Sequence, residues 1–114
     1  MVLTGHIPYL RNMILYNITF LVNEDIDAEF TAWIQYDFLP KLANEAIFKG
    51  QSFLKVLDSP NEGETYSLQM MSPGEQEIEI FKSGFFKRIQ EKTSQHWEGR
   101  LYLFESKMKY IAFH

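Results

Sequence analysis

The sequence contains no cysteine, and this absence removes several kinds of site at once. It excludes a disulfide framework, a thiolate nucleophile and any zinc or iron–sulfur site whose ligands are cysteines. A chain without disulfides is compatible with a cytoplasmic location, which is our expectation for this protein.

Positive charge is also scarce. Eleven Lys and Arg residues stand against fifteen Asp and Glu residues, which gives a net charge of −4, and the basic residues are scattered along the chain. A surface that binds nucleic acid needs concentrated positive charge to neutralise phosphates. We therefore expect no nucleic-acid partner.

Long apolar runs are missing as well. The longest stretch of mainly apolar character, residues 13–22, also contains Tyr16, Asn17 and Thr19. A membrane-spanning helix needs about 20 predominantly apolar residues, so this segment cannot cross a bilayer. It also lacks the small-residue cleavage site of a signal peptide. We expect no membrane partner.

What the chain does contain is apolar and aromatic material: 46% of its 114 residues are hydrophobic and 16% are aromatic. This composition and length predict one folded domain with a real core, and we place it at residues 13–114. Residues 1–12 show neither helix nor strand periodicity. We expect them to form a leader or tail without fixed structure, or alternatively an arm that docks on a partner subunit.

Hydrophobic periodicity predicts the elements of this domain. Strands are expected over 13–22, 48–57, 64–71 and 101–113. The last segment is either one strand with a bulge or kink at 105–109 or a pair of strands. A first helix follows Asn23 and either ends at Pro40 or continues as a short successor from there. A second helix is expected after a capping box at 72–75, with proline at its first helical position.

The order βαββαβ predicts an α+β fold in which a four-stranded antiparallel sheet carries both helices on one face. The other face would then be bare. Leu15, Asn17, Thr19 and Leu21 are expected there, with Gln51 and Phe53 on the second strand and apolar residues from 101–104 on the last. Such an apolar face should meet a partner, most economically a second copy of the chain.

The segments MILYNITFLV, TYSLQM and HWEGRLYLFESKMKYI, together with the helix end from Trp33 to Pro40, resemble an uncharacterised bacterial family known from Bacteroidetes-type genomes. The resemblance covers residues 13–114. It implies a ferredoxin-like domain of the dimeric α+β barrel superfamily, which includes haem-degrading and cofactor-independent monooxygenases as well as members without known activity.

Haem-degrading members of that superfamily use an asparagine on the first strand, a tryptophan, and an iron-ligating histidine on the second helix. Asn17 matches the first of these, whereas His96 and Trp97 lie at or beyond the end of the expected second helix. The competing interpretation is that His96 and Trp97 fix the corner between that helix and the last strand. Trp33 has helical spacing with Phe30 and Ile34, which is typical of core packing.

RNA-recognition domains share the βαββαβ order and expose aromatic residues on their sheet. Their third strand carries a basic-glycine-aromatic run, and here the third strand is TYSLQMM instead. Together with the negative net charge, this difference argues against RNA binding.

We interpret the chain as a small-molecule-binding or regulatory homodimer that encloses a mostly apolar cavity between two sheets. The candidate cavity residues are Asn17, Thr19, Gln51, Phe53 and Gln69, with Asn17 as the polar anchor. A small apolar ligand is expected, and no motif specifies a cofactor, a metal site or a catalytic residue. The alternatives are a cofactor-independent or haem-degrading monooxygenase and a purely structural interaction module.

Overall fold

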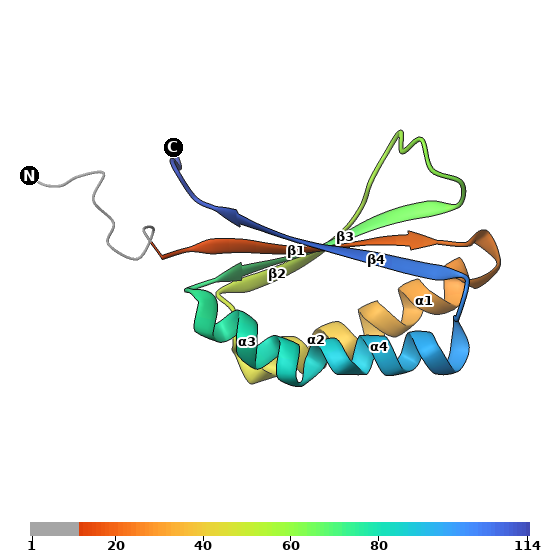
Figure 1. Ribbon diagram of the computed structural model, residues 1–114, viewed down its shortest axis with the longest axis horizontal. Helices are drawn as coiled ribbons and strands as arrows, with labels where there is room; N and C mark the ends of the chain where they lie inside the picture. The colour runs from red at the N-terminus through yellow and green to blue at the C-terminus, as the bar shows by residue number, and fades with distance from the viewer. Residues whose placement is uncertain (1–11) are drawn as a thin grey trace, which may run out of the picture.

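A four-stranded antiparallel sheet forms one layer of the molecule and the helices form the other (Figure 1). The computed structural model describes residues 12–114, so the expected leader lies, apart from Asn12, outside the described residues. The strands are β1 (Ile14–Val22), β2 (Gly50–Lys55), β3 (Glu64–Ser72) and β4 (Leu101–Lys109). Their order across the sheet is β2-β3-β1-β4. The prediction of a ferredoxin-like βαββαβ arrangement is confirmed.

The first helical region connects β1 to β2. It comprises a 3-10 turn (Glu24–Ile26), α1 (Asp27–Trp33), a π-helical turn (Ile34–Phe38) and α2 (Leu39–Glu45). Asn23 caps its start by accepting a hydrogen bond from the Asp25 backbone N–H. Pro40 occupies the first turn of α2. It therefore opens a short successor helix, the second of the two predicted alternatives, directly after the wide π turn.

The second helical region connects β3 to β4 and comprises α3 (Glu75–Ser83) and α4 (Phe85–His96). The predicted capping box is wrong. The residue before α3 is Gly74, and Ser72 ends β3 with its hydroxyl donating to the Gly74 carbonyl oxygen at 2.6 Å. Pro73 therefore precedes the helix instead of beginning it. The Ser-Pro-Gly-Glu segment makes a local turn in place of a helical first turn.

The core lies between the sheet and the helices. Alternate residues of the two central strands point into it, among them Ile18 and Phe20 from β1 and Leu68 and Met70 from β3, all inaccessible to solvent. Phe30 of α1 lies at its centre, with its ring 5.0 Å from that of Phe20 and 5.7 Å from that of Trp97. This packing fixes which face of the sheet the helices cover.

The predicted bulge in the last strand is absent. β4 pairs with β1 in one continuous register from Leu101 opposite Val22 to Lys109 opposite Ile14. The sequence changes character at Glu105 because the charged residues of this half-strand point to the helix side and its uncharged residues, Ser106 and Met108, point away. A continuous strand keeps this alternation throughout.

None of the helices in the described part of the chain has the length and apolarity that crossing a membrane requires.

Candidate ligand-binding face

The sheet face without helices, here called the open face, is assembled from alternate residues of all four strands (Figure 1). The strand register fixes its members, because residues opposite each other point to the same side. The two central strands contribute Leu15, Asn17, Thr19, Leu21, Thr65, Ser67, Gln69 and Met71. The two edge strands contribute Ser52, Leu54, Tyr102, Phe104, Ser106 and Met108. None of these residues is charged.

The open face has a polar centre that is organised by Asn17, a nearly buried side chain. Its amide nitrogen donates to the Thr19 hydroxyl at 2.9 Å and to the Ser106 hydroxyl at 3.3 Å. Its amide oxygen accepts from the Ser67 hydroxyl. These four residues, the Asn17 cluster, come from three adjacent strands.

The hydrogen bonds of the Asn17 cluster determine which polar groups it can offer to a ligand. Both amide protons of Asn17 are used within the cluster, so this side chain is held in place. The hydroxyls of Thr19 and Ser106 each accept from Asn17 and keep their own proton for donation. Asn17 therefore positions two hydroxyl donors at the centre of the face. Its role as the polar anchor of a ligand stays a prediction.

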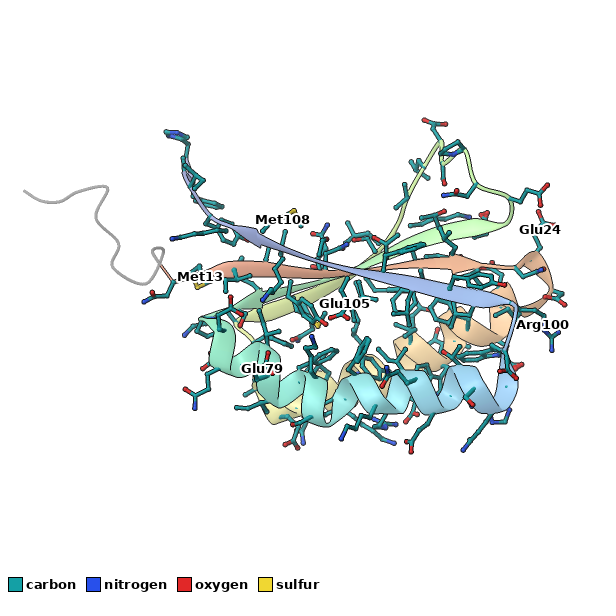
Figure 2. All side chains as sticks on the ribbon, in the orientation of Figure 1. Met13, Glu24, Glu79, Arg100, Glu105 and Met108 are labelled. Atoms are coloured by element: carbon teal, nitrogen blue, oxygen red, sulfur yellow. The ribbon has the colours of Figure 1, made fainter. Side chains whose placement is uncertain are left out.

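Apolar side chains surround this polar centre. Tyr102 and Phe104 on β4 are 58% and 57% exposed, and Leu54 and Met108 are also exposed. Figure 2 shows Met108 on the side of the sheet away from the helices and Glu105 on the helix side. The face thus combines aromatic and aliphatic surface with a few fixed hydrogen-bonding groups, which is the usual make-up of a small-molecule or subunit interface.

The structure separates the predicted cavity residues into two groups. Asn17, Thr19 and Gln69 lie on the open face as expected. Gln51 and Phe53 do not point to this face as expected, because they stand opposite Met70 and Leu68 on the helix side. Gln51 nevertheless lines a hollow at one end of the open face, whereas Phe53 does not. The Phe53 ring stacks on Tyr66 at 5.2 Å within the core. A shift of one residue in strand phase exchanges the two faces, and the sequence of β2 does not determine that phase.

Most residues of the open face were absent from the predicted cavity residues, among them Ser67, Phe104, Ser106 and Met108. A signal for three of them is present in the last strand, where Phe104, Ser106 and Met108 alternate with Glu105, Lys107 and Lys109. Read as one regular strand, this alternation places the charged and uncharged residues on opposite faces.

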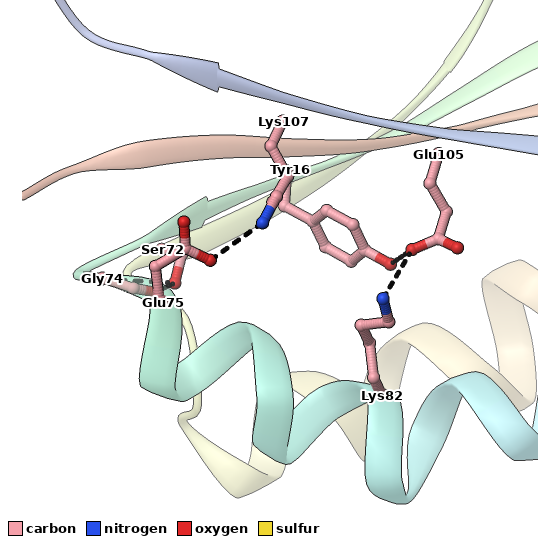
Figure 3. A network of polar contacts seen from close by, with 7 residues as sticks. All are labelled: Tyr16, Ser72, Gly74, Glu75, Lys82, Glu105 and Lys107. Atoms are coloured by element: carbon pink, nitrogen blue, oxygen red, sulfur yellow. Dashed lines mark hydrogen bonds and ion pairs between the residues drawn. The ribbon is translucent and has the colours of Figure 1, made fainter.

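A separate polar network lies on the helix side, at the edge formed by β4 and α3 (Figure 3). The Tyr16 hydroxyl donates to Oε1 of Glu105 at 2.5 Å, and Lys82 Nζ is 3.5 Å from the same oxygen. Burial, and then the hydrogen bond to Glu105, raise the pKa of Tyr16 far above its ordinary value. Tyr16 therefore stays protonated and acts as a structural donor rather than as a base.

Trp97 is completely buried, and its indole Nε1 donates to Glu29 Oε1 at 3.2 Å. His96 is exposed at the last residue of α4, in the helix layer. This geometry fits the interpretation that the pair fixes the helix-to-strand corner. Trp33 packs against Phe38 and Trp97, as its helical spacing predicted.

No three His, Asp or Glu side chains within residues 12–114 converge to hold a metal ion.

Residues 13–111 match a protein family described as a domain of unknown function, DUF4286. The chain belongs to this DUF4286 family. No curated protein matches it. The match covers nearly all of the described residues, including every strand of the open face.

Two solved structures show the same fold at low sequence identity. A conserved protein of unknown function from Bacteroides thetaiotaomicron, described as a possible oxidoreductase, is 11% identical with a TM-score of 0.66, over 88% of this chain and 99% of its own. A conserved protein from Methanosarcina mazei is 14% identical with a TM-score of 0.66, over 86% of this chain and 94% of its own. The DUF4286 chain thus shares its architecture with uncharacterised proteins.

Proposed function

We propose that this DUF4286 chain is a homodimer of the dimeric α+β barrel type, in which two open faces meet and enclose a small-molecule site. Its role would be to bind or sense a small, largely apolar compound. The observation that carries the proposal is the open face itself: an uncharged surface with exposed aromatic side chains around a fixed polar centre.

The absence of charge on the open face favours a second copy as the occupant. In a chain with 23% charged residues, four strands place no charged side chain on this side. A neutral apolar face can meet its own copy without like-charge repulsion, and two-fold pairing of identical surfaces is the commonest form of association. Exposed aromatic residues are typical of such interfaces.

The surroundings of the open face support the same occupant. The loop between β2 and β3 and the segment after β4 both rise on the side away from the helices (Figure 1). They carry Leu57, Ile111 and Phe113, which are all largely exposed. Apolar side chains on both raised flanks would add to the surface that a partner sheet covers.

Light scattering on matched lysine variants tests the proposal. Phe104→Lys places a charge at the proposed interface and should convert a dimer into a monomer at micromolar concentration. Ile80→Lys is the control, because Ile80 is 49% exposed but lies on α3 in the helix layer. It should leave the dimer intact. The same mass in solution for Phe104→Lys and Ile80→Lys would contradict the proposal.

An oxygenase without a bound cofactor is the alternative activity for the same site, and the description of the Bacteroides neighbour as a possible oxidoreductase points in this direction. The haem-degrading form of the alternative lacks support, since Asn17 lies on the open face and His96 lies at the end of α4, on the opposite side of the sheet. Titration with haemin tests this form, and a shifted haem absorbance band that depends on His96 would restore it.

A further inference from the structure

A hollow of about 310 Å³ lies at one end of the open face, where β1, β2 and β3 run side by side. Its lining includes Leu15 and Met71, which stand opposite each other, and Ser52 and Gln69, which also stand opposite each other. Lys49 just before β2, Gly50 and Gln51 at its start, and Tyr110 just after β4 also line it. This volume is at the lower end of the range for small-molecule sites.

Gly50 explains why the surface is hollow there. It pairs with Met71 in the row of the open face that also holds Leu15 and Met108. A Cβ atom added at Gly50 would meet nothing within 4 Å. The missing side chain therefore leaves a gap in a row whose other members are bulky.

The polar groups around the hollow differ from those of the neighbouring Asn17 cluster. Asn17, Thr19 and Ser106 bond to one another. Within residues 12–114, by contrast, no hydrogen bond or ion pair joins the side chains of Lys49, Ser52, Gln69 or Tyr110 to another residue. The hollow thus has side-chain hydrogen-bond donors that are free to bind a ligand, whereas most donors of the Asn17 cluster are used within the cluster.

The chemistry of the lining selects a class of ligand. Among the residues that the structure describes, Lys49 is the only charged one in the lining, and the other polar members are neutral amides and hydroxyls. One cation among neutral donors suits an anion with a single charge, and a doubly charged phosphate ester would lack a second cation. Leu15 and Met71 offer an apolar surface for the rest of the molecule.

We propose that this hollow binds a small monocarboxylate, whose carboxylate meets Lys49 and Gln69 and whose apolar body rests on Leu15 and Met71. The inference rests on the proposed small-molecule function of the open face and names the ligand class. The lining comes from one protomer, so the site does not need the partner to exist.

Benzoate and its neutral isostere benzamide are suitable probes, with binding to the full chain followed by chemical-shift titration. Benzoate should bind at least about tenfold more tightly than benzamide, because only benzoate makes a charge-assisted contact with Lys49. Lys49→Gln should weaken benzoate binding by about tenfold and leave benzamide unchanged. Lys87→Gln, a control on exposed α4 surface, should change neither.

Gly50→Leu should abolish binding of both probes by filling the hollow. Gly50 does not have a positive φ, so leucine is sterically acceptable. Gln69→Leu is a second variant that keeps the volume and removes the amide, and it should weaken benzoate binding. Benzoate binding that survives Gly50→Leu, or equal binding of benzoate and benzamide, would overturn the inference.

Light scattering on the same samples separates the two proposals. A monomeric chain that binds benzoate in a manner sensitive to Gly50→Leu would contradict the dimer and support the carboxylate site. A dimer that binds neither probe would contradict the carboxylate site alone.

Discussion

The two faces of the sheet are built from the same strands, and they differ in what their polar groups do. On the helix side, Ile18, Phe20, Leu68 and Met70 are sealed in an aromatic core. On the open side, the corresponding positions in the same strands hold Asn17, Thr19, Ser67 and Gln69. The helix side forms the buried core, and the open side presents exposed apolar side chains together with hydrogen-bonding groups. Both of our proposals therefore place function on the open side.

The largest expected effect is in the core. Phe30→Ala should lower the free energy of unfolding by about 3–5 kcal/mol, because a fully buried ring that contacts several other aromatic rings is lost and a cavity remains. Denaturant unfolding measures the change. The control, Tyr36→Ala, removes a ring that is 79% exposed and should change stability by less than about 0.5 kcal/mol. Similar losses in both variants would show that the core does not lie where we place it.

A smaller effect is expected at the polar centre of the open face. Asn17→Leu should lower the free energy of unfolding by about 1–3 kcal/mol. The Ser67 hydroxyl loses its acceptor, and the hydrogen bonds from Asn17 to Thr19 and Ser106 are lost as well. In a double-mutant cycle, adding Ser67→Ala should cost less in the Asn17→Leu background than in the unaltered chain. Strict additivity would mean that the two side chains are not coupled.

The smallest effect concerns the helix side at high pH. Tyr16→Phe removes the hydrogen bond to Glu105 and should lower the free energy of unfolding by about 1–2 kcal/mol near neutral pH. Burial and Glu105 raise the pKa of Tyr16 in the folded state above its ordinary value of 10.0. The stability linked to its proton is therefore complete below pH 10.0 and falls as the pH rises above it.

Tyr16→Phe should accordingly lose less stability than the unaltered chain between about pH 9 and pH 11. The free energy of unfolding of Tyr16→Phe should still fall with pH in this range, because burial and Asp27 also raise the pKa of Tyr66. Urea unfolding at several pH values measures both slopes, with Tyr36→Phe as the exposed control. Identical slopes for Tyr16→Phe and the unaltered chain would show that Tyr16 ionises in the folded protein as it does when unfolded.

Periodicity predicted the element order, the helix-covered core and the existence of a bare face, because long apolar patterns such as those of residues 13–22 and 78–89 leave few alternatives. It also placed Asn17, Thr19 and Gln69 on the bare face, where the strand register has them. Short sequence motifs were less reliable predictors of where a helix begins. Ser72 and Pro73 match a helix-start motif but form a turn before the helix. Motifs of this kind depend on where the preceding strand ends.

The errors at the site have a single physical cause. The face to which a strand residue points depends on the phase of the strand, and β2 is a short edge strand with weak alternation. Gln51 and Phe53 were therefore placed on the wrong side. The hollow at Gly50 could not be predicted either, because it exists only through the register that sets glycine beside Met71, Leu15 and Met108.

The most direct test of the central claim, that the open face is covered by a second copy, is the mass of the unaltered chain in solution. Light scattering across a micromolar concentration series should give twice the chain mass of 13.5 kDa. A mass of 13.5 kDa throughout that series would contradict the claim and leave the open face as a surface for some other partner.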